Sequence, residues 1–166
     1  IEVVEDGYVI WGVGVDDGQL FHFIHKYDFE GGFVGENEMV FENEYFYTGL
    51  VNSMQWNPYT EQFVVLQGSI IDDSIYGRLL SFDTNLELDQ NVNYNNYAPN
   101  TYFFGFLIEP DGYVIYGEYG PIVNGEGTFI MKIDFDGNVL WNEIMQPEVD
   151  QHIYRNWSIV PIDSGY

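Results

Sequence analysis

A strand motif that recurs about every 50 residues constrains this 166-residue chain more than any other feature. The motif at 112–117, Gly-Tyr-Val-Ile-Tyr-Gly, has counterparts at 7–12 and 62–68. The aromatic residues that mark the three copies are Tyr8, Phe63 and Tyr113. A fixed period of this length is the signature of a repeat architecture, in which each copy is one supersecondary unit.

A second landmark keeps the same period. The apolar run that follows each motif ends in an aspartate, and these are Asp28, Asp83 and Asp134. The chain therefore divides into approximate repeats at 1–50, 51–102 and 103–157, and a fourth copy begins at 158–166. Because the sequence stops inside that fourth strand motif, we expect it to be a fragment of a longer chain.

The third repeat predicts a four-stranded antiparallel meander. Its β-branched and aromatic runs lie at 104–108, 113–116, 128–133 and 138–144. Such residues favour a pleated, half-buried surface, and the Asp-Gly pairs between the runs are hairpin signals. The Asn-rich segment 91–100 predicts a loop, since Asn and Pro favour turns. No stretch shows a sustained helical period.

The composition indicates a folded and strongly acidic protein. Hydrophobic residues make up 46% of the chain, which is too much for intrinsic disorder, and the formal net charge is −23. That charge repels phosphate backbones, so we expect no nucleic-acid partner. No apolar run approaches the roughly 20 residues that span a bilayer, so we expect no membrane span. The absence of cysteine excludes disulfides and thiolate chemistry.

The repeat resembles those of secreted bacterial β-propellers, which are common in Bacteroidetes-type, type IX secretion-associated surface proteins. The resemblance is carried in the third repeat by Lys132, Asp134, Gly137 and Trp141. The first repeat keeps Lys26 and Asp28 but has no Trp, and the second keeps only Asp83. The resemblance implies a secreted or cell-surface protein whose familiar relatives are adhesins, scaffolds and surface binders, some of them carbohydrate-active.

We therefore predict an all-β fold of about three four-stranded antiparallel blades, forming a partial β-propeller over residues 1–166 that belongs to a larger ring. The alternative is a β-trefoil, which also has three repeats of four strands. Trefoil repeats are shorter and close after three copies. The overhanging copy at 158–166 argues against that alternative.

Acidic residues recur in the hairpin loop of each repeat. They are Asp16 and Asp17, Asp72 and Asp73, and Glu126. Equivalent loops of a propeller lie on one face, where carboxylates from several blades could hold calcium. The alternative is ordinary turn chemistry, because Asp and Gly are what tight turns prefer.

A second candidate cation site is the Asp134-x-Asp136-Gly137 segment, which is similar to the start of a calcium loop. An EF-hand is excluded because neither a distal Glu nor flanking helices follow. An aspartate-capped hairpin turn explains the same residues without any ion. The sequence leaves both interpretations open, so calcium is the one cofactor that we consider.

The histidines give no metal site by themselves. His22 and His25 lie on one predicted strand, where side chains alternate, so they point to opposite faces. The favoured interpretation is that they are structural. The Gly12-x-Gly14 pair is followed by a strand, so it lacks the helix N-terminus of a phosphate loop.

The sequence favours a non-catalytic extracellular or cell-surface binding or scaffold module, which a cation could stabilise. Its expected partners are the remaining blades of the parent chain and a protein or glycan ligand. The alternative is a carbohydrate-binding or carbohydrate-active propeller that uses carboxylates and aromatics near the axis. The aromatics considered as sugar platforms are Tyr45, Phe46, Tyr47, Tyr94, Tyr97 and Tyr102, but the favoured interpretation is that most aromatics pack between blades. An enzyme is the less favoured interpretation, because no catalytic pair stands out.

Overall fold

A computed structural model describes residues 1–41, 44–45, 53–71, 74–94, 101–119 and 127–145, all of them in strands, turns or extended connections. The strands are β1 (Glu2–Val4), β2 (Gly7–Asp16), β3 (Gln19–Tyr27), β4 (Phe33–Met39), β5 (Glu44–Tyr45), β6 (Ser53–Asn57), β7 (Gln62–Ile71), β8 (Ser74–Phe82), β9 (Leu88–Tyr94), β10 (Thr101–Glu109), β11 (Gly112–Tyr119), β12 (Gly127–Ile133) and β13 (Val139–Met145). Within these ranges, no helix is long and apolar enough to cross a membrane.

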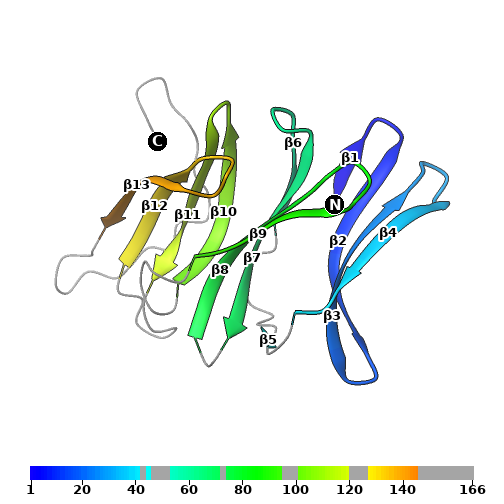
Figure 1. Cartoon of the computed structure of the whole chain (residues 1–166), viewed down its shortest axis with the longest axis horizontal. Helices are drawn as coiled ribbons and strands as arrows, with labels where there is room; N and C mark the ends of the chain where they lie inside the picture. Colours follow the sequence, from blue (N-terminus) through cyan, green and yellow to red (C-terminus); the bar gives the residue numbers. More distant parts are fainter. Residues whose placement is uncertain (42–43, 46–52, 72–73, 95–100, 120–126, 146–166) are drawn as a thin grey trace.

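The strands form three separate antiparallel sheets that follow one another along the chain (Figure 1). Sheet 1 has the order β1-β2-β3-β4, and sheet 3 has the order β10-β11-β12-β13. In sheet 2, β5 and β6 pair with β7, which is followed by β8 and β9. The all-β class and the four-stranded meander predicted for the third repeat are therefore confirmed.

The three sheets share one register between their two central strands. Tyr8 pairs with Tyr27 in sheet 1, Phe63 with Phe82 in sheet 2 and Tyr113 with Ile133 in sheet 3. Two residues along, the pairs are Ile10 with His25, Val65 with Leu80 and Ile115 with Met131. A one-residue slip would exchange the two faces of a strand, so this agreement gives every position an equivalent in the other sheets.

The sheets pack face to face in one repeated sense. We call the face that carries Tyr8, Phe63 and Tyr113 the front face of each sheet, and the opposite face the back face. The back face of sheet 1 buries Val9 and Ile24 against front-face residues of sheet 2, including Val65 and Leu80. The back face of sheet 2 buries its own apolar residues against the front face of sheet 3, and these are Val64, Leu66 and Leu79 against Tyr113, Ile115 and Met131. Each contact is thus front to back.

Hydrogen bonds near the outer strands repeat this front-to-back contact. The Asn37 amide on β4 donates to the Leu86 carbonyl of sheet 2 at 2.8 Å. The Tyr94 hydroxyl on β9 donates to the Gly137 carbonyl of sheet 3 at 3.1 Å. Leu86 and Gly137 occupy equivalent places in the turns that follow β8 and β12, and both have positive φ. One acceptor position therefore serves both sheet contacts.

The predicted loop at 91–100 is wrong in its first half. Asn91 and Asn93 belong to β9, where they pair with Leu80 and Arg78. Between and after them, Val92 is partly buried and Tyr94 is buried, so the strand alternates as a half-buried strand should. Pairing with β8 outweighs the turn preference of Asn, because strand preference depends mostly on neighbours. Residues 95–100 lie outside the described part of the chain.

His22 makes the contact between sheets 1 and 2 sensitive to pH. The ring is only 2% exposed and stacks on Trp11 and against Phe41. Burial, and then the nearby Arg78 guanidinium, lower the pKa of His22 to about 4. The unfolded chain therefore takes up this proton first, at its ordinary pKa of about 6.5, and stability is lost as the pH falls between these values.

Lowering the pH from 7 to 5 is expected to reduce the free energy of unfolding by about 2 kcal/mol through His22. Urea unfolding at the two pH values measures the loss. His22→Phe keeps a ring on Trp11 and removes the titrating group, so its loss over this range should be clearly smaller. An equal loss in both proteins would contradict the assignment to His22.

Candidate functional site

The repeated aspartates form one turn, built three times. In each copy the aspartate N–H donates to the carbonyl of the residue four positions on: Gly32 for Asp28, Glu87 for Asp83 and Asn138 for Asp134. The carboxylate of the same aspartate accepts a bond from the N–H of that residue, at 2.6, 2.9 and 2.7 Å respectively. The side chain thereby satisfies a backbone donor that the bend would leave unpaired.

Both carboxylate oxygens of Asp134 are used within this turn. Oδ1 accepts from the Asn138 N–H at 2.7 Å and Oδ2 accepts from its side-chain amide at 3.0 Å. The Asn138 side chain and then its backbone N–H lower the pKa of the Asp134 carboxyl. Turn chemistry therefore accounts for Asp134, while Asp136 is exposed beside it. Calcium binding at this pair stays a prediction.

Of the acidic hairpin-loop residues predicted as a separate cation site, the structure describes Asp16 and Asp17. Asp17 and Gly18 have φ values of 46° and 80°, as a two-residue type I′ hairpin requires, and Asp16 and Asp17 are exposed. Their turn joins β2 to β3 at the lower edge in Figure 1, opposite to the edge where β12 turns into β13. Asp72, Asp73 and Glu126 lie outside the described residues.

The proposed sugar platforms are also not supported where they are described. Tyr94 is 4% exposed and Tyr102 is 9% exposed, so both rings are core residues. Tyr94 packs against Phe103 with ring centroids 6.0 Å apart. No side chain of Tyr45, Phe46, Tyr47 or Tyr97 lies within the described part of the structure.

An aromatic surface lies on the front face of sheet 1. Tyr8 is 37% exposed there, whereas its equivalents Phe63 and Tyr113 are 3% and 1% exposed, because sheets 1 and 2 cover them. Rings at alternate positions of β3, with Phe33 of β4, continue this surface. These residues are Phe21, Phe23, His25 and Tyr27, and each ring contacts the next.

Two glycines of β2 make this aromatic surface possible. A Cβ on Gly12 would collide with the Phe23 ring, and a Cβ on Gly14 would collide with the Phe21 ring. Both rings therefore lie flat across β2. The Gly-x-Gly pair is explained by this close packing, which agrees with the exclusion of a phosphate loop.

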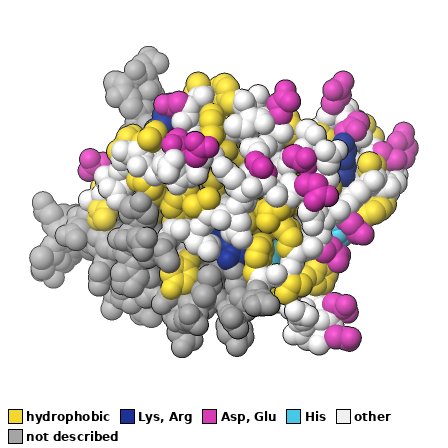
Figure 2. Space-filling view, viewed as in Figure 1, with side chains coloured by type: hydrophobic (Ala, Val, Ile, Leu, Met, Phe, Trp, Pro, Cys, Tyr) yellow, Lys and Arg dark blue, Asp and Glu magenta, His cyan; other side chains and the backbone are white. Residues whose placement is uncertain are grey.

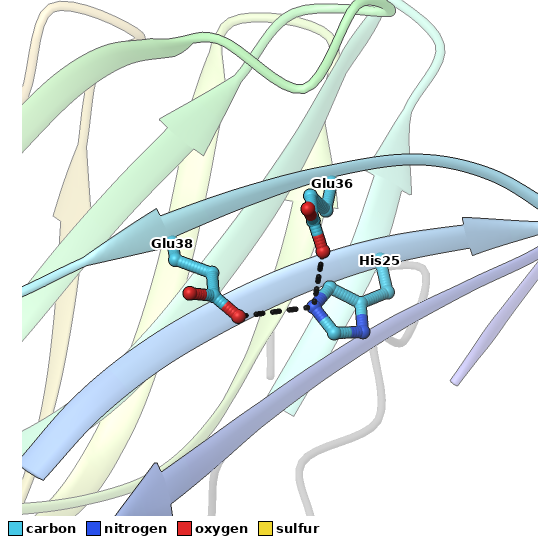
Figure 3. A group of neighbouring side chains, drawn as sticks. All are labelled: His25, Glu36 and Glu38. Carbon is cyan, nitrogen blue, oxygen red and sulfur yellow. Dashed lines mark ion pairs between the residues drawn. The ribbon is translucent and has the colours of Figure 1, made fainter. Parts of the chain in front are cut away.

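A histidine and two glutamates meet within this surface (Figure 3). His25 projects from β3, and Glu36 and Glu38 project from the same face of β4. The His25 Nε2 lies 3.6 Å from a Glu36 carboxylate oxygen and 3.8 Å from a Glu38 carboxylate oxygen. The three ligand atoms all lie within 4.8 Å of one another. Both glutamate side chains are 53% exposed, whereas the histidine is 18% exposed.

The prediction that His22 and His25 face opposite ways is confirmed, since His22 packs at the contact with sheet 2. Sequence reasoning missed the two glutamates. The available signal was the Glu-x-Glu spacing at 36–38, which places both carboxylates on one face of a strand. The register in which β3 pairs with β4 decides which histidine the two glutamates meet, and only the structure gives that register.

Acidic side chains are otherwise spread over the surface. Figure 2 shows them, in magenta, dispersed over the upper and right-hand parts of the described face, with few basic groups among them. The described lysines each join an acidic residue: Lys26 joins Asp6 at 2.9 Å, and Lys132 joins Asp111 at 2.6 Å and Glu109. On this face the acidic residues are therefore dispersed and do not gather at one site.

Comparisons with known proteins give no family for this chain: no family model, no curated protein and no solved structure matches it. The likeness to propeller repeats is therefore a resemblance of motif.

Proposed function

We propose that this chain is a set of β-propeller blades acting as a non-catalytic binding or scaffold module outside the cell or on its surface. The carrying observation is the repeated front-to-back contact between sheets of identical central register. Among the described residues, no strand of one sheet pairs with a strand of another sheet, as separate blades require. A trefoil would pair strands of different repeats into one barrel.

In this proposal the front face of sheet 1 receives the back face of a further blade, which the parent chain supplies. Tyr8 occupies the position at which Phe63 and Tyr113 are buried by the preceding sheet. The Gly31 carbonyl occupies the position of the Leu86 and Gly137 carbonyls, which accept bonds from the preceding sheet. Both the apolar contact and the polar acceptor of a blade interface are therefore present.

A front-to-back contact joins two different surfaces, so repeating it generates a ring if the rotation closes. Ring closure also covers the large aromatic surface, which a monomeric protein seldom leaves exposed. The complete ring would then present the ligand-binding face, as in other propellers. The acidic composition favours cationic ligands.

The first experiment is the intact mass of the native polypeptide that carries this sequence. A mass well above 19.3 kDa is expected. A mass of 19.3 kDa would contradict the supply of further blades by the parent chain. Sedimentation equilibrium of the 166-residue chain would then show whether a second copy covers the front face instead.

Phe23→Lys tests the covered face directly. In the native polypeptide the change is expected to lower the free energy of unfolding by about 2 kcal/mol or more, because it buries an unpaired ammonium group at a blade contact. In the 166-residue chain, where Phe23 is only half-buried, the loss should be clearly smaller. Val15→Lys, at an exposed position of β2, is the matched control and should give a small loss in both. Equal losses for Phe23→Lys in the two proteins would rule out the blade contact.

The second candidate function is carbohydrate binding. It is favoured by the exposed ring of Phe33, which lies beside His25 and hence beside the Glu36 carboxylate. An aromatic ring next to carboxylates suits a sugar, which stacks by its apolar face and donates hydrogen bonds from its hydroxyls. A glycan array with a turnover assay separates the two candidates. Specific binding that Phe33→Ala removes would favour the carbohydrate function.

A further inference from the structure

We infer that His25, Glu36 and Glu38 form a binding site for a divalent transition metal of the zinc class. All three ligands belong to sheet 1, so the inference does not require a further blade, although they lie on the front face that such a blade would cover. The site also differs from the calcium sites predicted from the sequence, because those involve other residues, which lie in turns between strands. The argument rests on the spacing of the donors, their orientation and their charge.

The donor spacing fits a metal better than direct contact. Zinc binds imidazole nitrogen and carboxylate oxygen at about 2.0–2.2 Å, so donors around a tetrahedral ion lie about 3.4 Å apart. The His25 Nε2 lies 3.6 and 3.8 Å from the nearest oxygens of Glu36 and Glu38. These distances are too long for hydrogen bonds. They come within a few tenths of an ångström of the spacing that an ion between the three donors needs.

The histidine is held with Nε2 directed at the two carboxylates. Its ring lies against Phe23, with centroids 4.4 Å apart, and edge-on to Phe33 at 5.7 Å. The other ring nitrogen, Nδ1, lies 3.4 Å from the Tyr27 hydroxyl. The Nε2 atom is buried and makes no hydrogen bond. A metal-binding histidine has this arrangement, with one nitrogen held by a second group and the other turned to the ion.

No described basic side chain neutralises the two glutamates. Each of the three described basic residues is bonded elsewhere: Lys26 to Asp6, Arg78 to Asn93 and Lys132 to Glu109. Two carboxylates on one strand face repel each other, and a divalent cation removes that repulsion. The exposed side of the pair leaves room for a fourth ligand, such as water, which three-ligand zinc sites keep.

The ligand set selects the class of metal. Imidazole suits zinc, copper, nickel and iron, whereas calcium and magnesium take oxygen ligands almost exclusively. The other sheets lack this set at the equivalent positions. Sheet 2 has Leu80, Asn91 and Asn93 there, and sheet 3 has Met131, Asn142 and Ile144. The three ligands therefore occur in sheet 1 alone among the described sheets. Sheets 2 and 3 have other side chains at the equivalent positions.

The chain itself supplies the replacements for a test. His25→Leu, Glu36→Asn and Glu38→Asn introduce the residues that sheet 2 carries at the same positions, so the triple variant is expected to fold. Circular dichroism and urea unfolding check that it does. Glu143→Asn, an exposed carboxylate on β13, is the matched control. The protein used is the 166-residue chain.

Calorimetric titration with zinc chloride is expected to show one tight site in the unaltered chain and in the control variant. Each single substitution should weaken zinc binding at least tenfold, and the triple variant should lose the site. Cobalt(II) should give the visible absorption of a low-symmetry, four-coordinate site in the unaltered chain only. Calcium chloride should not compete for the site.

Two results would overturn the inference. One is zinc binding by the triple variant as tight as in the unaltered chain, which would place the ion elsewhere. The other is zinc binding by the unaltered chain that is no tighter than zinc binding by the triple variant. His25 would then be only an ion-pair partner of the two glutamates. Neither result bears on blade assembly, because the mass measurement and Phe23→Lys test that separately.

Discussion

Replacing Phe103 by alanine is expected to lower the free energy of unfolding by about 3–5 kcal/mol, the cost of deleting a large buried ring. Phe103 is 1% exposed and lies between sheets 2 and 3. It packs against Tyr94 and Phe129, and its ring fills the space over Gly77, where any Cβ would collide with it. Because Gly77 has no side chain, it cannot fill the cavity that removal of the Phe103 ring would leave.

Chemical unfolding of Phe103→Ala, followed by fluorescence or circular dichroism, measures this loss. Phe29→Ala is the matched control, because Phe29 is 53% exposed in the turn after β3, and its loss should stay below about 1 kcal/mol. A loss for Phe103→Ala as small as the control's would mean that sheets 2 and 3 do not form the common core described here. Loss of cooperativity would indicate that the sheets unfold separately.

Replacing Gly112 by alanine is expected to cost at least about 3 kcal/mol, because two penalties coincide. Gly112 has a φ of 150°, in a region that side-chain-bearing residues rarely adopt. A Cβ there would also collide with the Ile133 carbonyl oxygen. That oxygen belongs to the backbone of β12 and cannot rotate away, so the β11–β12 ladder itself would have to move.

Gly35→Ala is the control for Gly112→Ala. Gly35 has no positive φ, and a Cβ there meets nothing, so this change should be within about 1 kcal/mol of neutral. Urea midpoints of the two variants give the comparison. A neutral Gly112→Ala would mean that the turn of residues 109–112 can take another form. Gly7 repeats the geometry of Gly112 in sheet 1, with the Tyr27 carbonyl in place of that of Ile133, so Gly7→Ala should behave alike.

Sequence reasoning reached the strands and turns because both are local. The Asp-Gly turns and the repeated aspartates fix bends through φ preferences and short-range hydrogen bonds, and these were read correctly at Asp134. It failed at Asn91, where pairing with β8 outweighs local preference. For Tyr94 and Tyr102 the favoured core interpretation holds, because both rings are buried by packing in the folded chain.

For the candidate site, too, sequence reasoning succeeded with local features and failed with contacts between strands. Strand alternation alone separated His22 from His25, and applied to residues 36–38 it would also have placed Glu36 and Glu38 on one face of a strand. It could not bring His25 to those glutamates, because the meeting depends on the register of β3 with β4. It proposed two separate cation sites, and the turns of Asp16 and Asp134 lie at opposite edges of their sheets.

The sequence by itself determined the repeat, the all-β class and the turn chemistry, since each depends on residues close together in the chain. Only the tertiary structure decided which face of each sheet meets the next, and hence that Phe63 and Tyr113 are buried while Tyr8 is not. The three residues share a motif and a register. Their difference arises from burial against a neighbouring sheet, a property of the stack that no single repeat encodes.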